Sequence, residues 1–119
     1  MRRPRRLEFF ENKTVRRKRW WAAESNCGRG IHGRQAFGAL QFECNIGDDQ
    51  RTVDLFERYT DSKAALFHQT ESFAPFSKEF FAVAKLTRWV IYGTPSDEFK
   101  KANADFHPIY LTLFDGFVR

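Results

Sequence analysis

A strand that runs directly into a helix is the feature of this sequence that most constrains its fold, and it occupies residues 51–68. Alternate residues of a strand face opposite sides, and one side here would carry Val53, Leu55, Glu57 and Tyr59. Asp61 or Ser62 can cap the first free amides of a helix, which residues 64–66 (Ala-Ala-Leu) then favour. Because the turn is short, Tyr59 and His68 can face a common crevice, which suits chemistry on a small aromatic molecule.

Further strands and helices are predicted after residue 37. Residues 39–46 alternate, with Leu40, Phe42, Cys44 and Ile46 on one face, and a hairpin turn at 47–50 leads into the strand at 52–59. Pro75 predicts the first turn of a second helical stretch, whose apolar stripe would contain Phe76, Phe80, Phe81 and Ala84. A third strand is expected at 86–92 and a last strand at 109–114.

A capping box at Thr94-Pro95-Ser96-Asp97, with Pro95 at the first helical position, predicts a short helix that extends to about Asn103. Twelve of the fourteen Phe residues lie from Phe37 onward, enough apolar volume for one core. Together these elements predict an α+β fold, with a ferredoxin-like antiparallel sheet and helices on one face.

Residues 1–36 differ from the rest of the chain. Residues 1–34 carry eleven Lys/Arg and three Glu, a net charge of +8, whereas residues 35–119 carry nine Lys/Arg and twelve Asp/Glu, a net charge of −3. Neither a strand period nor a helix period emerges in this first third. The sequence therefore predicts a basic, irregular and poorly packed segment at 1–36, joined to a folded domain at 37–119. Such a segment could be a replacement for an original one, a degenerate sequence, or a translation in the wrong reading frame, and each would lack a strand or helix period.

Several classes of protein are disfavoured by composition. No apolar run approaches the ~18 residues of a membrane span, and no apolar stretch follows the basic start as it would in a secretory signal. Cys27 and Cys44 form no CxxC motif, and the Asp48-Asp49 pair suits a hairpin turn better than a metal site. We therefore expect no metal, and a cytoplasmic protein with reduced thiols.

One set of motifs resembles the antibiotic biosynthesis monooxygenase (ABM) family. The run Leu-Phe-Glu-Arg-Tyr at 55–59 is followed by Ser62, the Ala-Ala-Leu at 64–66 and His68, and in that family a Glu-Arg-Trp/Tyr strand end is commonly followed nine residues later by a His. The resemblance continues through 38–43, 73–84, 87–92, 92–97 and 108–110. It covers about residues 37–119, is typical of a subgroup with a C-terminal extension, and leaves the family's first strand and helix without a counterpart in 1–36.

The resemblance implies a homodimeric α+β barrel with one pocket per subunit between sheet and helices. It implies a monooxygenase without a cofactor, which combines dioxygen with a small aromatic, quinol or polyketide-type substrate. The catalytic residues would be His68, as acid or base, and Tyr59, as a hydrogen-bonding wall. The substrate-binding residues would be Phe42, Leu55, Glu57 and Trp89.

The basic segment leaves a second function open. Its cations lie beside Trp20 and Trp21, a combination that suits single-stranded nucleic acid or an anionic membrane surface. The alternative is therefore a non-catalytic dimeric binding protein with a basic arm, whereas a monooxygenase would carry the segment as a disordered tail without nucleic-acid binding. Affinity that falls steeply as salt rises would identify the binding protein.

Overall fold

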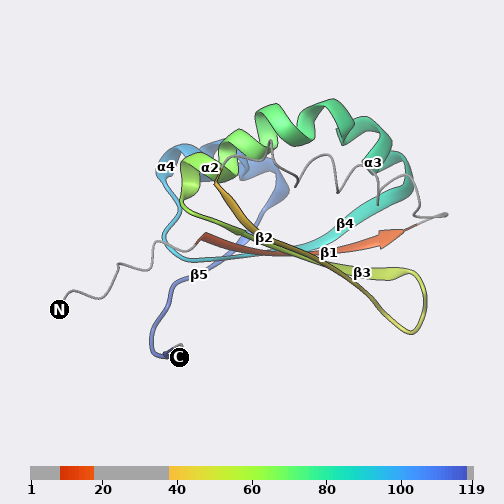
Figure 1. Cartoon of the computed structure of the whole chain (residues 1–119), viewed down its shortest axis with the longest axis horizontal. Coiled ribbons are helices and arrows are strands. Elements are labelled where there is room, and N and C mark those ends of the chain that lie inside the picture. Colours follow the sequence, from red (N-terminus) through yellow and green to blue (C-terminus); the bar gives the residue numbers. More distant parts are fainter. Residues whose placement is uncertain (1–8, 18–37, 118–119) are drawn as a thin grey trace.

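The computed structural model describes residues 9–17 and 38–117 of the chain (Figure 1). Within these ranges five strands form one sheet in the order β2-β3-β1-β4-β5. The strands are β1 (Phe9–Arg17), β2 (Ala39–Ile46), β3 (Thr52–Tyr59), β4 (Ala84–Tyr92) and β5 (Ile109–Leu111). Neighbours among β1 to β4 are antiparallel. This arrangement confirms the predicted α+β class and the ferredoxin-like topology.

The last strand differs from the prediction. β5 is parallel to β4, so the sheet is mixed, and it ends at Leu111 instead of residue 114. The reason lies in the connection, because a helix follows β4 and returns the chain to the same end of the sheet before β5 begins, as in any crossover between parallel strands.

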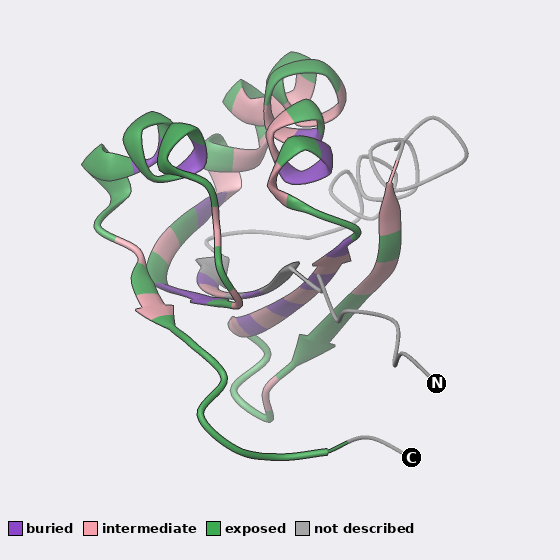
Figure 2. Ribbon diagram, turned by 90° about the vertical axis from the view of Figure 1, so that its left-hand side faces the viewer, coloured by how far each residue is buried: buried purple, intermediate pink, exposed green. Residues whose placement is uncertain are grey.

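Helices cover one face of the sheet (Figures 1 and 2). α2 (Ser62–Phe67) begins after Asp61, whose carboxylate accepts a hydrogen bond of 2.8 Å from the backbone amide of Ala64. The helical path continues through a π-helical turn (His68–Phe73) and a 3₁₀ turn (Ala74–Phe76) into α3 (Ser77–Val83). α4 (Asp97–Ala102) and a 3₁₀ turn (Ala104–Phe106) follow β4. Among the described residues, no helix is long and apolar enough to cross a bilayer.

The start of α4 corrects the predicted capping box. Ser96, not Thr94, caps the helix, and its hydroxyl accepts a hydrogen bond of 3.1 Å from the amide of Phe99. The amide of Ser96 in turn donates to the hydroxyl of Ser62, at 2.9 Å. This second bond holds Ser96 in an extended conformation and ties the beginning of α4 to the beginning of α2.

β1 occupies the centre of the sheet, within the segment for which the sequence predicted irregular structure. It pairs with β3 on one side and with β4 on the other. The expectation of irregular structure is therefore wrong for residues 9–17, while residues 1–8 and 18–36 lie outside the described ranges. Three residues of β1 lie on the inner face of the sheet, the buried Glu11 and Val15 and the half-buried Lys13 between them. Because two of the three are charged, the apolar alternation that identifies a strand is missing.

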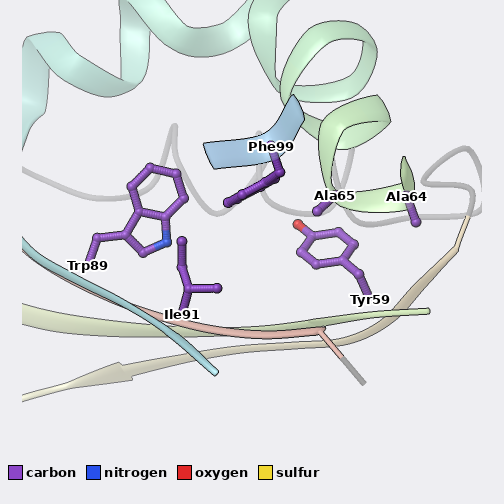
Figure 3. Close-up of a cluster of buried hydrophobic side chains, with 6 residues drawn as sticks. All are labelled: Tyr59, Ala64, Ala65, Trp89, Ile91 and Phe99. Carbon is purple, nitrogen blue, oxygen red and sulfur yellow. The ribbon is translucent and has the colours of Figure 1, made fainter. Parts of the chain in front are cut away.

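The core lies between the sheet and the helices. One cluster of buried side chains contains Tyr59, Ala64, Ala65, Trp89, Ile91 and Phe99 (Figure 3). A second contains Val15, Val53, Leu55 and Ala84, and the half-buried Phe80 packs against it. The predicted core stripe of α3 is wrong in part, because Phe76 is only half-buried and Phe81 is 41% exposed. Phe80 and Phe81 instead pack edge to face on each other, with ring centres 5.2 Å apart.

Candidate active site

β3 carries two polar residues on its buried face. The predicted alternation is confirmed, since Val53, Leu55, Glu57 and Tyr59 are buried and the residues between them are half-buried. Glu57 is only 3% exposed. A carboxylate at that depth requires a partner of opposite charge, and the partner comes from β1.

Lys13 on β1 lies between two carboxylates. Its Nζ is 2.8 Å from Glu57 Oε2 and 3.1 Å from Glu11 Oε2. The strand register explains this arrangement, because Glu11 pairs directly with Glu57 across β1 and β3, and Lys13 stands two residues further along the same face. Lys13 Nζ also lies 4.9 Å from the ring centre of Trp89, its register partner on β4. The ammonium thus has an anion on either side and an aromatic face below it.

His68 reaches the same cluster from the helical layer. Its Nε2 lies 3.7 Å from Glu57 Oε1, which is ion-pair distance when the imidazole is protonated. Its ring is 5.5 Å from the ring of Tyr59 and 6.1 Å from that of Phe73. His68 is the first residue of the π-helical turn, a local widening of the helix that is frequent at functional sites. We name Glu11, Lys13, Glu57, Tyr59 and His68 the buried polar cluster.

Burial and charge shift the proton affinities within this cluster. Burial, helped by the neighbouring Glu57, raises the pKa of the Glu11 carboxyl from 4.5 to about 8, although Lys13 opposes the shift. Burial alone would lower the pKa of the Lys13 ammonium, but the charges of Glu11 and Glu57 outweigh it and raise that pKa. Burial and the same two carboxylates raise the pKa of Tyr59 well above its usual value. Glu11 therefore exchanges a proton near neutral pH, and Lys13 stays charged there.

Two buried polar groups of the site lack hydrogen-bond partners within the described part of the chain. Glu11 is 1% exposed, and neither of its carboxyl oxygens makes a hydrogen bond of good geometry there, although one is at ion-pair distance from Lys13. The indole N–H of Trp89, a residue 5% exposed, also finds no acceptor among these residues. Buried polar groups are usually satisfied, so both are candidates for contact with a bound polar molecule.

The sequence-predicted residues share one face of the sheet. Glu57, Tyr59 and His68 lie together, and Trp89 flanks them across β1 (Figure 3 labels Tyr59 and Trp89). Leu55 pairs in register with Lys13, while Phe42 on the edge strand β2 pairs with Glu57 and is half-buried.

The sequence prediction missed Glu11 and Lys13. The sequence did contain a signal for this strand, because Glu11, Lys13 and Val15 alternate after two Phe residues. That alternation predicts a strand only if charged residues are allowed on its inner face.

Comparison with solved structures identifies similar folds. MupZ from Pseudomonas fluorescens is 19% identical, with a TM-score of 0.80 over 94% of both chains. SnoaB, a cofactor-independent oxygenase from Streptomyces nogalater studied as a variant, is 13% identical, with a TM-score of 0.62 over 76% of this chain and 95% of its own. A proposed antibiotic biosynthesis monooxygenase from Chloroflexus aurantiacus is 8% identical, with a TM-score of 0.59 over 75% and 93%. No protein-family model and no curated protein matches the sequence.

Proposed function

We propose that this chain, which has the fold of the antibiotic biosynthesis monooxygenases, oxygenates a small aromatic, quinol or polyketide-type substrate without a cofactor. The observation that carries the proposal is the buried polar cluster, in which proton-exchanging groups lie under aromatic side chains. A shared fold is a weak argument for an activity. The cluster is a stronger one, because it supplies the proton transfer with which such a reaction begins.

The proposed chemistry follows from removing a proton from an electron-rich substrate. The resulting carbanion or phenolate gives electrons to dioxygen, and carbon and oxygen join as a hydroperoxide after protonation. Loss of a second proton from the same carbon breaks the O–O bond and leaves a carbonyl group and water. The substrate supplies all the electrons, so the protein must move protons and exclude solvent.

The side chains divide these tasks. His68 exchanges protons with the hydroperoxide as acid or base, and Tyr59 donates a hydrogen bond to the substrate. Glu57 holds the ammonium of Lys13 at 2.8 Å and approaches the imidazole of His68 at 3.7 Å, which orients both side chains. Phe42, Leu55 and Trp89 form the apolar walls.

The assembly is part of the same proposal. We propose a twofold homodimer in which the sheet face opposite the helices is covered by a second copy, because that face carries the half-buried Phe56. The cytoplasm is the proposed location, in line with reduced cysteines. The alternative of a basic binding arm depends on residues 1–36, of which 1–8 and 18–36 lie outside the described ranges.

Oxygen uptake with anthrone as the probe tests the activity. We expect wild type to consume dioxygen and form the ketone, and His68→Gln to lower turnover by about 10²- to 10⁴-fold, the usual contribution of general acid–base catalysis. Glu43→Gln is the control, because Glu43 is exposed and its carboxylate accepts a hydrogen bond from the side-chain amide of Gln41, which is not part of the buried polar cluster. Full activity of His68→Gln would exclude His68 as acid or base. Absence of uptake above the protein-free rate in wild type would reject the monooxygenase.

A further inference from the structure

We infer that Glu11 is the carboxylate that accepts the proton of the substrate, and that the site takes phenols and enolisable ketones, whose anionic oxygen replaces the Glu11 carboxylate beside Lys13. This inference deepens the proposed function and rests on it for the reaction that follows. It assigns the first proton transfer to a residue of β1 and leaves the later, hydroperoxide step to His68.

The two carboxylates beside Lys13 are not equivalent. Glu57 accepts a hydrogen bond from Nζ at 2.8 Å, and its other carboxyl oxygen lies 3.7 Å from Nε2 of His68, so each of its oxygens has a nitrogen of the cluster beside it. Glu11 lies 3.1 Å from Nζ without a hydrogen bond of good geometry to any described residue. Glu57 is thus the permanent counter-ion of Lys13, and Glu11 is the carboxylate that can give up its place there.

The exchange conserves charge around the ammonium. Before the reaction Lys13 faces the carboxylates of Glu11 and Glu57. When Glu11 takes the proton, it becomes neutral and the substrate becomes the second anion, so two negative charges and one positive charge persist within the cluster. A site whose charges are already in place stabilises the developing anion with little reorganisation.

The class of substrate follows from the donors and walls around Glu11. Lys13 Nζ and the indole N–H of Trp89 are hydrogen-bond donors, and the latter has no acceptor among the described residues. Two donors on neighbouring strands, Lys13 on β1 and its register partner Trp89 on β4, together with one proton acceptor suit an acidic hydroxyl or an enol. Trp89 also meets Phe99 and Phe106 edge to face, with ring centres 6.2 and 5.8 Å apart, which favours a flat apolar body over an amine.

Other titratable groups also face Glu11, and they set the pH range of the exchange. Within the described residues they are Lys13 on β1 and Glu57 and Tyr59 on β3, and His68 after α2 lies beside Glu57. β4 contributes Ile91, the register partner of Glu11, and Trp89, neither of which titrates in this range. Burial raises the pKa of Glu11 to about 8, so the carboxylate becomes abundant only above neutral pH.

The test uses 4-nitrophenolate, whose absorbance reports its ionisation. Binding of this anion should drive a proton onto Glu11. Calorimetry in buffers of different ionisation enthalpy should therefore detect about one proton taken up per bound anion at pH 9. At pH 7 it should detect little uptake, once the proton that 4-nitrophenol itself releases, measured from its absorbance, is subtracted. The dissociation constant for the anion should rise about tenfold from pH 7 to pH 9 in wild type and stay flat in Glu11→Gln, with Glu43→Gln behaving like wild type.

The outcomes separate this inference from the monooxygenase. Proton-linked binding without oxygen uptake would keep Glu11 and reject the oxygenation. Equal pH dependence in wild type and Glu11→Gln would overturn the role of Glu11, and failure of wild type to bind nitrophenolate would overturn the substrate class. If Glu11→Gln does not fold, infrared difference spectra of wild type at pH 9 decide the matter, because binding must increase the band of protonated carboxyl groups.

Discussion

Replacing Glu11 by glutamine should change how the stability of the protein depends on pH. Burial raises the pKa of Glu11 to about 8 from its ordinary 4.5. Between these values the folded protein holds a proton that the unfolded chain has released. The stability contributed by that proton is therefore complete below pH 4.5, declines as pH rises, and is gone above pH 8.

The magnitude follows from the size of this pKa difference. At about 1.4 kcal/mol per pKa unit, a shift of roughly 3.5 corresponds to an upper limit of about 5 kcal/mol in the free energy of unfolding. Most of the decline falls between pH 5 and pH 8, where it amounts to about 3–4 kcal/mol. Glutamine has the shape of the protonated carboxyl and does not titrate. The stability advantage of Glu11→Gln over wild type should therefore increase by about 3–4 kcal/mol between pH 5 and pH 8.

Urea unfolding of both proteins at pH 5, 6, 7 and 8, followed by circular dichroism, measures the difference. The two free energies should be similar at pH 5 and should diverge steadily toward pH 8, with Glu11→Gln the more stable. Glu43→Gln, which changes an exposed carboxylate, should follow wild type throughout. Parallel curves for wild type and Glu11→Gln would refute the reasoning, because they would mean that Glu11 has the same proton affinity folded and unfolded.

Two further predictions concern packing and assembly. Phe80→Ala should lower the free energy of unfolding by about 2–3 kcal/mol, because Phe80 is half-buried against the second core cluster, whereas truncating a fully buried Phe costs ~3–5 kcal/mol. Phe81→Ala should lower it by less, because Phe81 is 41% exposed. Equal losses in urea unfolding would contradict this ranking. Phe56→Glu should convert the proposed dimer into monomers in sedimentation at micromolar concentration, and a monomeric wild type would reject the sheet-face interface.

The segment from β3 to α2 could be predicted from sequence because its signals are local. The alternation of Val53 and Leu55 sets the buried face of the strand, and the Asp61 carboxylate binds the first turn of the helix as expected. Those two facts bring Glu57, Tyr59 and His68 together without any knowledge of the other strands. The prediction succeeded where neighbours in sequence are also neighbours in space.

β1 could not be predicted because its inward-facing charged residues interrupt the apolar pattern of a strand. Sequence rules expect apolar residues on the inner face of a central strand, and here Glu11 and Lys13 occupy it. Lys13 is tolerable there because Glu57, far along the chain, supplies the opposite charge, and Glu11 is tolerable because Lys13 lies beside it and burial favours its protonated form. Local rules are expected to fail at functional sites for this reason. The exposure of Phe81 could not be predicted either, since a stripe of Phe residues does not show that the rings of Phe80 and Phe81 will pack edge to face on each other.

The central place of β1 has a consequence for the order in which the chain can fold during synthesis. Both strands that pair with β1 in the described part of the chain are made later: β3 follows after more than thirty residues, and β4 ends at Tyr92. A nascent chain that has not yet produced β4 therefore leaves one edge of β1 open, while the ammonium of Lys13 has gained Glu57 but not the face of Trp89. Such late, non-local pairing slows folding and exposes a strand edge. Ribosome-stalled chains that end before β4 should consequently be the forms that depend most on chaperones.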